Sequence, residues 1–345
     1  MKVSLQARVV ANFGEAVAAL ATAARIATDD TRNSFPENTR SDETGNVAIE
    51  SDTLIKAIPL KRLPLLVAGD YIVCEGVVDE RAAEALGNES LSNISSLRVT
   101  RLIDRDSVLA RPNRQGQLKP LASNLSQLVI VCAANPPPDR LLIDQFCVVA
   151  GKENIEALIV LNKADLLNDT TDVAATEVLC KTYEDAGFDT LTMSTHTSTG
   201  FDEFCRALES HTSALVGQSG VGKSSIVSRL LPDQDIRVGE ISRRTGLGAH
   251  TTTVSFLYSI GTDGTLIDSP GVREFSVSHF SENDIAKGFP EIERLAVNCR
   301  FNDCHHDKEP DCAVRQAVIA KTINQERFDN YRRLIAGIRV VRAGR

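Results

Sequence analysis

The chain has 345 residues, of which 42% are hydrophobic and 24% are charged, and its formal net charge is −8 at pH 7. This length predicts two or three domains, each long enough to bury a hydrophobic core. We expect a cytoplasmic protein with no membrane segment, because neither a run of about 18 apolar residues nor a secretory signal pattern occurs. The acidic balance disfavours a general polyanion binder, although a local basic patch could still contact RNA.

Residues 1–112 are predicted to form a small β-barrel. Short strand-like segments alternate with polar turns, and strands without crossover helices must close or stack to bury one face. The alanine-rich stretch 15–27 is the one helix-like segment expected here. The polar stretches 28–46 and 79–96 are expected to be loops or insertions. The predicted strands are residues 47–49, 54–58, 71–78, 97–103 and 108–109.

The local charge becomes positive between residues 98 and 119. Only Asp104 and Asp106 oppose six basic side chains, which are Arg98, Arg101, Arg105, Arg111, Arg114 and Lys119. Two interpretations stay open at this point. The segment is either an RNA-contacting rim on the barrel or a solvated linker with scattered arginines.

From residue 124 the pattern changes to alternating strands and helices. Continuous apolar runs predict strands that are buried on both faces, and helical periodicity separates them. Such alternation predicts a mostly parallel, doubly wound sheet. The predicted strands are residues 128–133, 157–161, 190–193, 213–216 and 265–267, and the helices between them are 139–150, 176–186, 201–208 and 225–231.

A phosphate-binding loop is predicted between the strand at 213–216 and the helix that follows. The sequence there fits G-x-x-x-x-G-K-[ST] in full, whereas a Gly/Ser-rich surface turn would not require the Lys-Ser pair. Glycines allow backbone N–H groups to point at phosphates, and the helix N-terminus adds positive potential. Lys223 is expected to reach the terminal phosphates as a catalytic group, and Ser224 to ligate Mg²⁺. The predicted loop residues are Gly217, Gln218, Ser219, Gly220, Val221, Gly222, Lys223, Ser224 and Ser225.

An N-K-x-D sequence directly follows the strand at 157–161 and predicts a guanine site, hence GTP and GDP as ligands. It consists of Asn162, Lys163, Ala164 and Asp165. Asp165 would accept hydrogen bonds from guanine N1–H and the 2-amino group, and adenine offers no such pair of donors. Asn162 is expected to contact the base edge, and the Lys163 stem to lie along the ring.

Two further residues of the base site are predicted after the strand at 190–193. Ser194 and Thr195 begin the sequence S-T-H, at the position where GTPases place an S-A-K loop. A backbone amide of that loop meets the guanine O6 atom. We therefore expect Ser194 and Thr195 to lie beside the base.

Downstream of the phosphate loop, two segments are expected to sense the γ-phosphate. The sequence G-A-H-T-T-T at 248–253 contains three threonines, of which Thr252 is the first choice as a ligand of Mg²⁺ and the γ-phosphate. Asp268 and Gly271 are the ends of a D-x-x-G sequence that follows the strand at 265–267. Asp268 would hold Mg²⁺ through water, and the Gly271 amide would contact the γ-phosphate.

The residue that follows the D-x-x-G motif leads us to expect that the isolated protein hydrolyses GTP slowly. Many GTPases carry there the glutamine that orients the attacking water, but this chain has Val272. Valine cannot orient water, so His250, a backbone group or a partner surface must do so. We therefore expect hydrolysis to accelerate when a partner binds.

The order of the motifs is circularly permuted relative to common GTPases. The N-K-x-D and S-T-H sequences precede the phosphate loop here, and D-x-x-G follows it. The same sheet can form, because parallel strands need only be neighbours in space. As a result, the D-x-x-G turn leads directly into the C-terminal region, whose position could depend on the bound nucleotide.

A zinc site is predicted in the C-terminal region. The chain has eight cysteines, too few for a disulfide scaffold, and Cys299, Cys304 and Cys312 lie close together. Three thiolates and one imidazole suit tetrahedral Zn²⁺, with His305 and His306 as competing fourth ligands. The metal would stabilise a small helical appendage, with helices at 313–320 and 324–335, that cannot bury enough core alone.

Together these features resemble the ribosome small-subunit-dependent GTPase A family. The resemblance extends from about Val67 onward and rests on the permuted order, G-Q-S-G-V-G-K-S-S, D-S-P-G-V-R, C-x₄-C-x-H-x₅-C and D-S-V-L-A-R-P at 106–112. It implies an OB-fold-like RNA-binding domain at 1–112, a circularly permuted α/β GTPase domain at 113–278 and a zinc-binding helical domain at 279–345. It also implies His306 as the fourth zinc ligand and a catalytic role for His250.

The resemblance implies a function as well. Members hydrolyse GTP under stimulation by the 30S ribosomal subunit, act as a checkpoint late in its maturation and contact 16S rRNA. We expect a monomer. Two alternatives are a nucleotide-gated rRNA-binding factor, in which hydrolysis only drives release, and a permuted GTPase that serves the large subunit.

Overall fold

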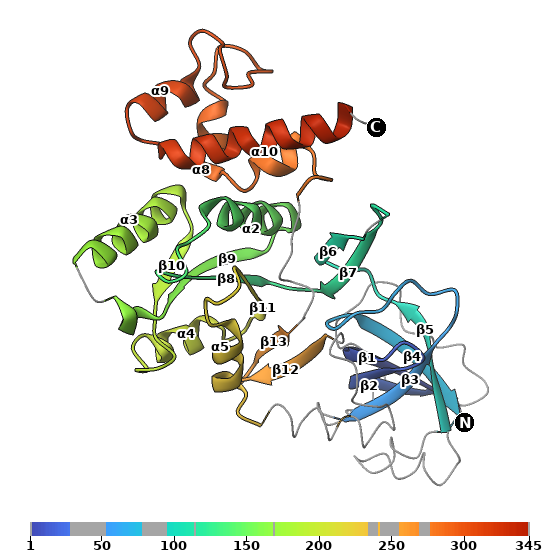
Figure 1. The fold of residues 1–345 in the computed structure, drawn as a ribbon. Helices are drawn as coiled ribbons and strands as arrows, with labels where there is room; N and C mark the ends of the chain where they lie inside the picture. The colour runs from blue at the N-terminus through green and yellow to red at the C-terminus, as the bar shows by residue number, and fades with distance from the viewer. Residues whose placement is uncertain are drawn as a thin grey trace.

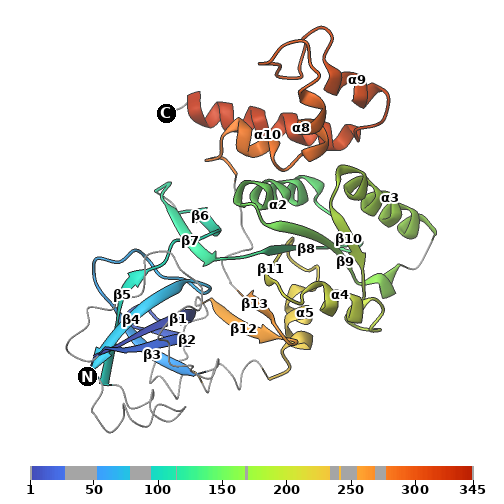
Figure 2. The ribbon, with the colours of Figure 1, turned by 180° about the vertical axis from the view of Figure 1, so that it is seen from behind.

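The protein has three regions in chain order: an N-terminal barrel, a central sheet with helices on both faces, and a C-terminal group of helices (Figure 1). The view from behind also places the barrel at one edge of the sheet and the C-terminal helices over one face (Figure 2). This computed structural model describes residues 2–27, 53–77, 95–113, 115–167, 170–233, 241, 255–268 and 277–343. Across those residues, no helix combines the length and the apolar character that crossing a membrane requires.

Five strands form the closed barrel that the sequence predicted. β1 pairs with both β2 and β4, which closes the order β1-β2-β3-β5-β4. All pairs are antiparallel except β3 with β5. The predicted strand 47–49 lies outside the described residues. The barrel strands are β1 (Lys2–Asn12), β2 (Val17–Ala27), β3 (Leu54–Pro59), β4 (Tyr71–Val77) and β5 (Ser95–Leu102).

The helix expected at 15–27 is wrong, because this stretch forms strand β2. Val17, Ala19 and Ala21 alternate toward the barrel core and are fully buried. Their backbone pairs with β1 along the whole strand. Alanine favours a helix only by a fraction of a kcal/mol per residue, so the ladder with β1 overrides that preference. Small side chains also suit the interior of a narrow barrel.

A two-stranded hairpin, β6 (Val108–Pro112) with β7 (Leu118–Ser123), connects the barrel to the central sheet. The predicted boundary between residues 112 and 113 falls in its turn and stays a prediction. Asp70, which has no exposed surface, accepts hydrogen bonds from Arg105, at 2.7 Å, and from the Ser123 hydroxyl, at 2.6 Å. Asp70 therefore ties the barrel to β7 through Ser123, and the Arg105 guanidinium is engaged by Asp70 rather than presented to RNA.

The central sheet has the order β10-β9-β8-β11-β13-β12, and only β12 runs antiparallel to its neighbour. This confirms the mostly parallel sheet, to which β12 adds an edge strand that the sequence did not predict. β1 pairs with β12 at Ala11 and Phe256, which continues the sheet into the barrel. The strands are β8 (Gln127–Ala133), β9 (Glu156–Asn162), β10 (Asp189–Thr192), β11 (Thr212–Val216), β12 (Phe256–Ile260) and β13 (Gly264–Asp268).

Helices cover both faces of this sheet. Leu128 and Ile130 of β8 pack in one core with α2 and α3, whereas Val129 and Val131 pack in the opposite core with α4 and α5. Burial of alternate residues on both faces explains the continuous apolar run of β8. The helices are α2 (Arg140–Glu153), η2 (Ala164–Leu166), α3 (Thr170–Ala186), α4 (Phe201–Ala207) and α5 (Lys223–Leu230).

The C-terminal helices pack on α2 and α3 and share one hydrophobic core with them. Gly288 approaches α2 so closely that a Cβ atom there would lie 2.5 Å from the Val148 backbone. Cys147 of α2 and Phe328 of α10 belong to the same core. The helices are α7 (Glu282–Ala286), α8 (Pro290–Ala296), α9 (Ala313–Ile319) and α10 (Gln325–Ala343).

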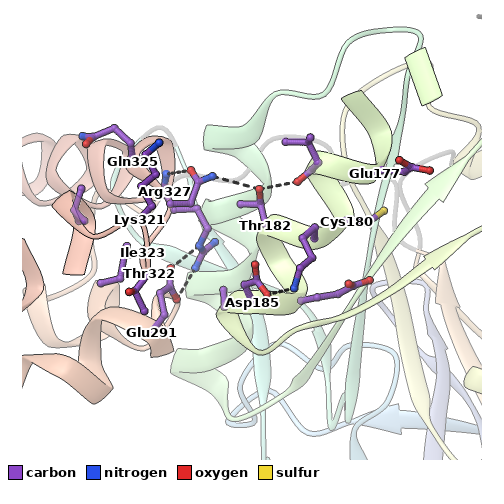
Figure 3. A pocket seen from close by; sticks show the side chains of 16 residues that line it. Glu177, Cys180, Thr182, Asp185, Glu291, Lys321, Thr322, Ile323, Gln325 and Arg327 are labelled. Carbon is purple, nitrogen blue, oxygen red and sulfur yellow. Dashed lines mark hydrogen bonds and ion pairs between the residues drawn. The ribbon is translucent and has the colours of Figure 1, made fainter. Parts of the chain in front are cut away.

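Arg327 of α10 lies at the centre of this contact and is buried with two carboxylates. Its guanidinium donates to Asp144 of α2 and to Glu291 of α8, both at 2.6 Å. Asp144 also accepts from the Asn330 amide, at 2.7 Å, and from the Tyr183 hydroxyl, at 2.9 Å. Beside this network lies a groove of about 840 Å³ between α3 and the segment that joins α9 to α10 (Figure 3).

Candidate functional site

The sequence G-x-x-x-x-G-K-S forms a tight loop between β11 and α5. Gly217 has φ +131°, and a Cβ atom there would lie 2.1 Å from the Val131 carbonyl oxygen, so only glycine fits. α5 begins at Lys223, whose ammonium donates to the carbonyls of Gly217 and Gln218, each at 2.6 Å. A loop of this shape next to a helix N-terminus is suited to binding phosphate.

The predicted base-binding segment lies directly beside the phosphate loop. Asn162, buried at the end of β9, donates from its side-chain amide to the Val221 carbonyl at 3.0 Å. The Lys163 ammonium donates to the carbonyls of Gly220, at 2.6 Å, and Asn135, at 2.9 Å. Ala164 donates from its backbone N–H to the Met193 carbonyl at 3.0 Å. These contacts join the ends of β8, β9 and β10 around the loop.

Asp165 is held by the loop that follows β10. The Ser194 hydroxyl donates to Asp165, and this hydrogen bond holds the pKa of that carboxyl below its ordinary value of 3.8. Ser194 is fully buried and accepts hydrogen bonds from the N–H groups of His196 and Thr197, both at 3.1 Å. The Thr195 N–H points at the Asn162 side-chain oxygen, 3.4 Å away. The carboxylate is thus ionised at neutral pH and can only accept hydrogen bonds.

Nothing in the sequence pattern indicated Arg229 of α5 as part of this region. Its guanidinium donates to the Thr195 carbonyl and, at 2.6 Å, to the Ser198 hydroxyl. It also lies over the Phe201 ring, 4.0 Å from the ring centre. An arginine so far along the chain from this loop carries no motif that would place it there.

Of the predicted γ-phosphate sensors, Asp268 is the one that the structure describes. It ends β13, which runs parallel to β11, so Asp268 lies at the same edge of the sheet as the phosphate loop. Thr252, His250 and Gly271 lie outside the described residues, and their roles stay predictions. Ser224 and Ser225 form the first turn of α5, next to Lys223.

Four side chains in the C-terminal module converge on one point. The ligand atoms of Cys299, Cys304, His306 and Cys312 all lie within 4.8 Å of one another. Two sulfur atoms on one tetrahedral Zn²⁺ would be about 3.8 Å apart, given Zn–S bonds of roughly 2.3 Å. The Cys299 and Cys312 sulfurs are 3.8 Å apart, and His306 Nδ1 is 3.4 Å from the Cys312 sulfur. The donor set and its spacing fit a metal ion of the zinc type.

Between the two neighbouring histidines, the structure places His306 in the cluster. His306 is buried, whereas the exposed His305 has its Nδ1 atom 3.0 Å from the Arg339 guanidinium. Cys312 caps α9, where its sulfur accepts the Arg315 N–H at 3.5 Å. A helix N-terminus stabilises a thiolate, which is the form of cysteine that binds metal.

Fold and site together define a class of protein. A parallel sheet carries a phosphate loop after β11, an N-K-x-D segment after the next-but-one strand β9, and an aspartate at the end of β13. This is a phosphate-loop nucleotide-binding protein with its GTPase motifs in permuted order.

Comparison with known proteins assigns the family. The model of the RsgA GTPase family matches residues 102–278. The chain is 43% identical to the small ribosomal subunit biogenesis GTPase RsgA of Ectopseudomonas mendocina (strain ymp), over 80% of this chain and 76% of that protein. The chain is 42% identical to the protein of that name from Azotobacter vinelandii (strain DJ), again over 80% of this chain and 76% of that protein. The chain belongs to the RsgA GTPase family.

Solved structures agree with the fold. The crystal structure of YjeQ from Thermotoga maritima has a TM-score of 0.70 and 22% identity, covering 97% of this chain and 98% of that one. YloQ, described as a circularly permuted GTPase, has a TM-score of 0.68 and 22% identity, covering 97% and 95%. Membership in a GTPase family implies binding of GTP or GDP and of Mg²⁺.

Proposed function

We propose that this protein hydrolyses GTP to GDP and phosphate under stimulation by the small ribosomal subunit, as a checkpoint late in maturation of that subunit. The carrying observation is the contact network that joins Asn162, Asp165 and Ser194 to the phosphate loop. A carboxylate of the guanine-binding type close to a phosphate-binding loop supports GTP as the substrate. The relatives named as small ribosomal subunit biogenesis GTPases support the partner. A cytoplasmic location follows from that partner.

In this proposal the base is read by the N-K-x-D segment. Asp165 accepts from guanine N1–H and the 2-amino group, and the buried Asn162 holds the base site against the phosphate loop. The Lys163 stem packs along the ring, beside Ala164. Ser194 orients Asp165, and the backbone around Ser194 and Thr195 faces guanine O6.

The phosphates occupy the loop Gly217–Ser225, with its backbone N–H groups and the Lys223 ammonium as donors. Ser224, Thr252 and Asp268 are assigned to Mg²⁺, and Gly271 to the γ-phosphate. When bound, Mg²⁺ would offset the negative charge of the phosphates. His250 is assigned a role near the attacking water. Val272 cannot orient that water, so the isolated protein is a slow enzyme and the ribosomal subunit completes the site.

The two flanking regions contact 16S rRNA. The barrel offers an OB-type surface for RNA, and the zinc-bound helical region provides a second attachment point. Arg98 and Arg101, on β5 of the barrel, are candidates for contact with phosphates. Arg105 is not a candidate, because it is paired with Asp70. The assigned zinc ligands are Cys299, Cys304, His306 and Cys312, and the protein acts as a monomer.

The test is steady-state hydrolysis of GTP by the purified protein alone, with purified 30S subunits and with 50S subunits. A partner that completes a catalytic site should raise the rate by at least about tenfold, and only with 30S subunits. Hydrolysis that is equally slow with and without 30S subunits, in a protein that binds them only with GTP, would instead show a nucleotide-gated rRNA-binding factor. Stimulation by 50S subunits alone would show a GTPase of the large subunit.

A further inference from the structure

Arg229 lies outside every nucleotide-binding motif of this chain, yet it connects two of them. It belongs to α5, the helix whose first turn carries Lys223 and Ser224 of the phosphate loop. Its guanidinium reaches across to the loop at 194–200, which holds Asp165 through Ser194. The two ends of the nucleotide site are thereby linked through one partly buried side chain.

The arginine makes three contacts at once. It donates to the Thr195 carbonyl and to the Ser198 hydroxyl, and its plane lies over the Phe201 ring. Two donors in a rigid fork together with a flat face are features of guanidinium that lysine cannot reproduce. The contacts are therefore specific to arginine.

The loop that it holds needs such support. Ser198 has φ +68° and Gly200 has φ +66°, so the backbone turns sharply before α4. Ser198 is an unfavourable residue for this left-handed conformation. Asn162 anchors the front of the loop by accepting the Thr195 N–H, and Arg229 holds the same residue by its carbonyl. Thr195 is thus held through both its backbone N–H and its backbone carbonyl.

We infer that Arg229 is a positioning residue for guanine recognition. It fixes the loop 194–200, and through Ser194 the orientation of Asp165, to the helix that begins at the bound phosphates. This inference rests on the proposed guanine site. Its consequence is that loss of Arg229 weakens recognition of the base more than binding of the phosphates.

The measurement compares GDP with IDP, which lacks the 2-amino group that Asp165 accepts from, in equilibrium binding to the full-length protein with Mg²⁺. Arg229→Ala should raise the Kd for GDP by on the order of tenfold, the size expected when charge-assisted hydrogen bonds are lost. It should also reduce the preference for GDP over IDP by at least about threefold, because Asp165 loses its fixed position. Arg229→Lys should not restore the preference.

Two further variants control the experiment. Arg206→Ala removes the same charge from neighbouring α4 and should leave both affinities unchanged. Ser198→Ala removes one acceptor of Arg229 without altering α5, and should lower the preference for GDP in the same direction even if Arg229→Ala fails to fold.

Three results would overturn the inference. In one, Arg229→Ala binds GDP like the wild type. In another, GDP and IDP weaken equally, which would mean that Arg229 supports only the phosphate-loop helix. If Arg229→Ala does not fold, an unchanged preference for GDP over IDP in Ser198→Ala would overturn the inference. A wild-type protein without preference for GDP over ADP would instead overturn the proposed function itself.

Discussion

The orientation and charge of the Asp165 side chain depend on the residues that contact it. The Asp165 carboxylate is oriented by the Ser194 hydroxyl, which is itself fixed by two backbone N–H groups. Because that hydrogen bond lowers the carboxyl's pKa, Asp165 stays charged throughout the neutral range. It therefore presents only acceptors to a base, and guanine presents the two matching donors.

Changing this carboxylate to an amide should change the base that binds. Asp165→Asn replaces one acceptor with a donor, so guanine N1–H and the 2-amino group lose a partner, while the 2-oxo group of xanthine gains one. We expect GDP affinity to fall at least about 100-fold and XDP affinity to rise, by the rule that unpaired buried polar groups discriminate strongly. Equilibrium binding of both nucleotides measures this. Asp202→Asn on α4 is the control, and unchanged GDP affinity in Asp165→Asn would contradict the base assignment.

At the scale of elements, the segment between α8 and α9 contains too few apolar residues to fold by burial alone. Its order comes from the four converging side chains at Cys299, Cys304, His306 and Cys312 and from the cap that Cys312 makes on α9. A metal ion bound there supplies folding energy to such a short segment. The segment and its ion should therefore be gained and lost together.

The two adjacent histidines allow a matched test of the metal. We expect about one zinc ion per chain in the purified protein, because three thiolates and one imidazole make a closed site. His306→Ala should lower zinc retention during dialysis against a chelator by at least about tenfold, whereas His305→Ala should retain it. Metal analysis after dialysis measures both. Equal loss in the two variants would contradict the assignment of His306.

At the scale of the whole molecule, buried charged groups link both flanking regions to the segments beside them. Asp70, which pairs with Arg105, accepts a hydrogen bond from Ser123 of β7, and Arg327 with Asp144 and Glu291 joins α10 to α2. α2 also begins beside the phosphate loop, since the Asp139 N–H faces the Gln218 side-chain oxygen at 3.4 Å. One helix thus extends from the nucleotide site to the C-terminal region.

Removal of Arg327 should destabilise the protein by about 3–5 kcal/mol, because two buried carboxylates lose their cation. Burial already raises the pKa of Asp144 to about 6, and Arg327 opposes this rise. In Arg327→Ala the folded-state pKa must rise further above the unfolded value, so the native state binds a proton more tightly than the unfolded state. The loss of folding stability in Arg327→Ala should therefore be smaller at pH 5.5 than at pH 8.

Denaturant unfolding at both pH values measures that difference. Arg332→Ala is a suitable control, because Arg332 lies on the same helix but makes an exposed ion pair with Asp307, which contributes little to stability. If the loss of stability in Arg327→Ala were the same at both pH values, the unpaired Asp144 carboxylate would not be its cause.

The sequence by itself determined the parts that depend on local chemistry. The phosphate loop, N-K-x-D, the strands at 128–133 and 157–161 and the cysteine cluster are recognisable because glycine, lysine, carboxylate and thiolate have few alternatives at those spacings. The alternation of strands and helices was enough to predict the parallel sheet. None of these inferences required knowledge of contacts between distant residues.

Only the tertiary structure decided what depends on contacts between distant residues. The alanine-rich stretch Val17–Ala27 forms a strand rather than a helix because β1 lies beside it. Arg105 serves the interior because the buried Asp70 needs a cation. Arg229 reaches a loop 34 residues upstream, which no sequence motif indicates. Propensity and spacing act over a few residues, whereas burial and charge pairing depend on which segments meet in space.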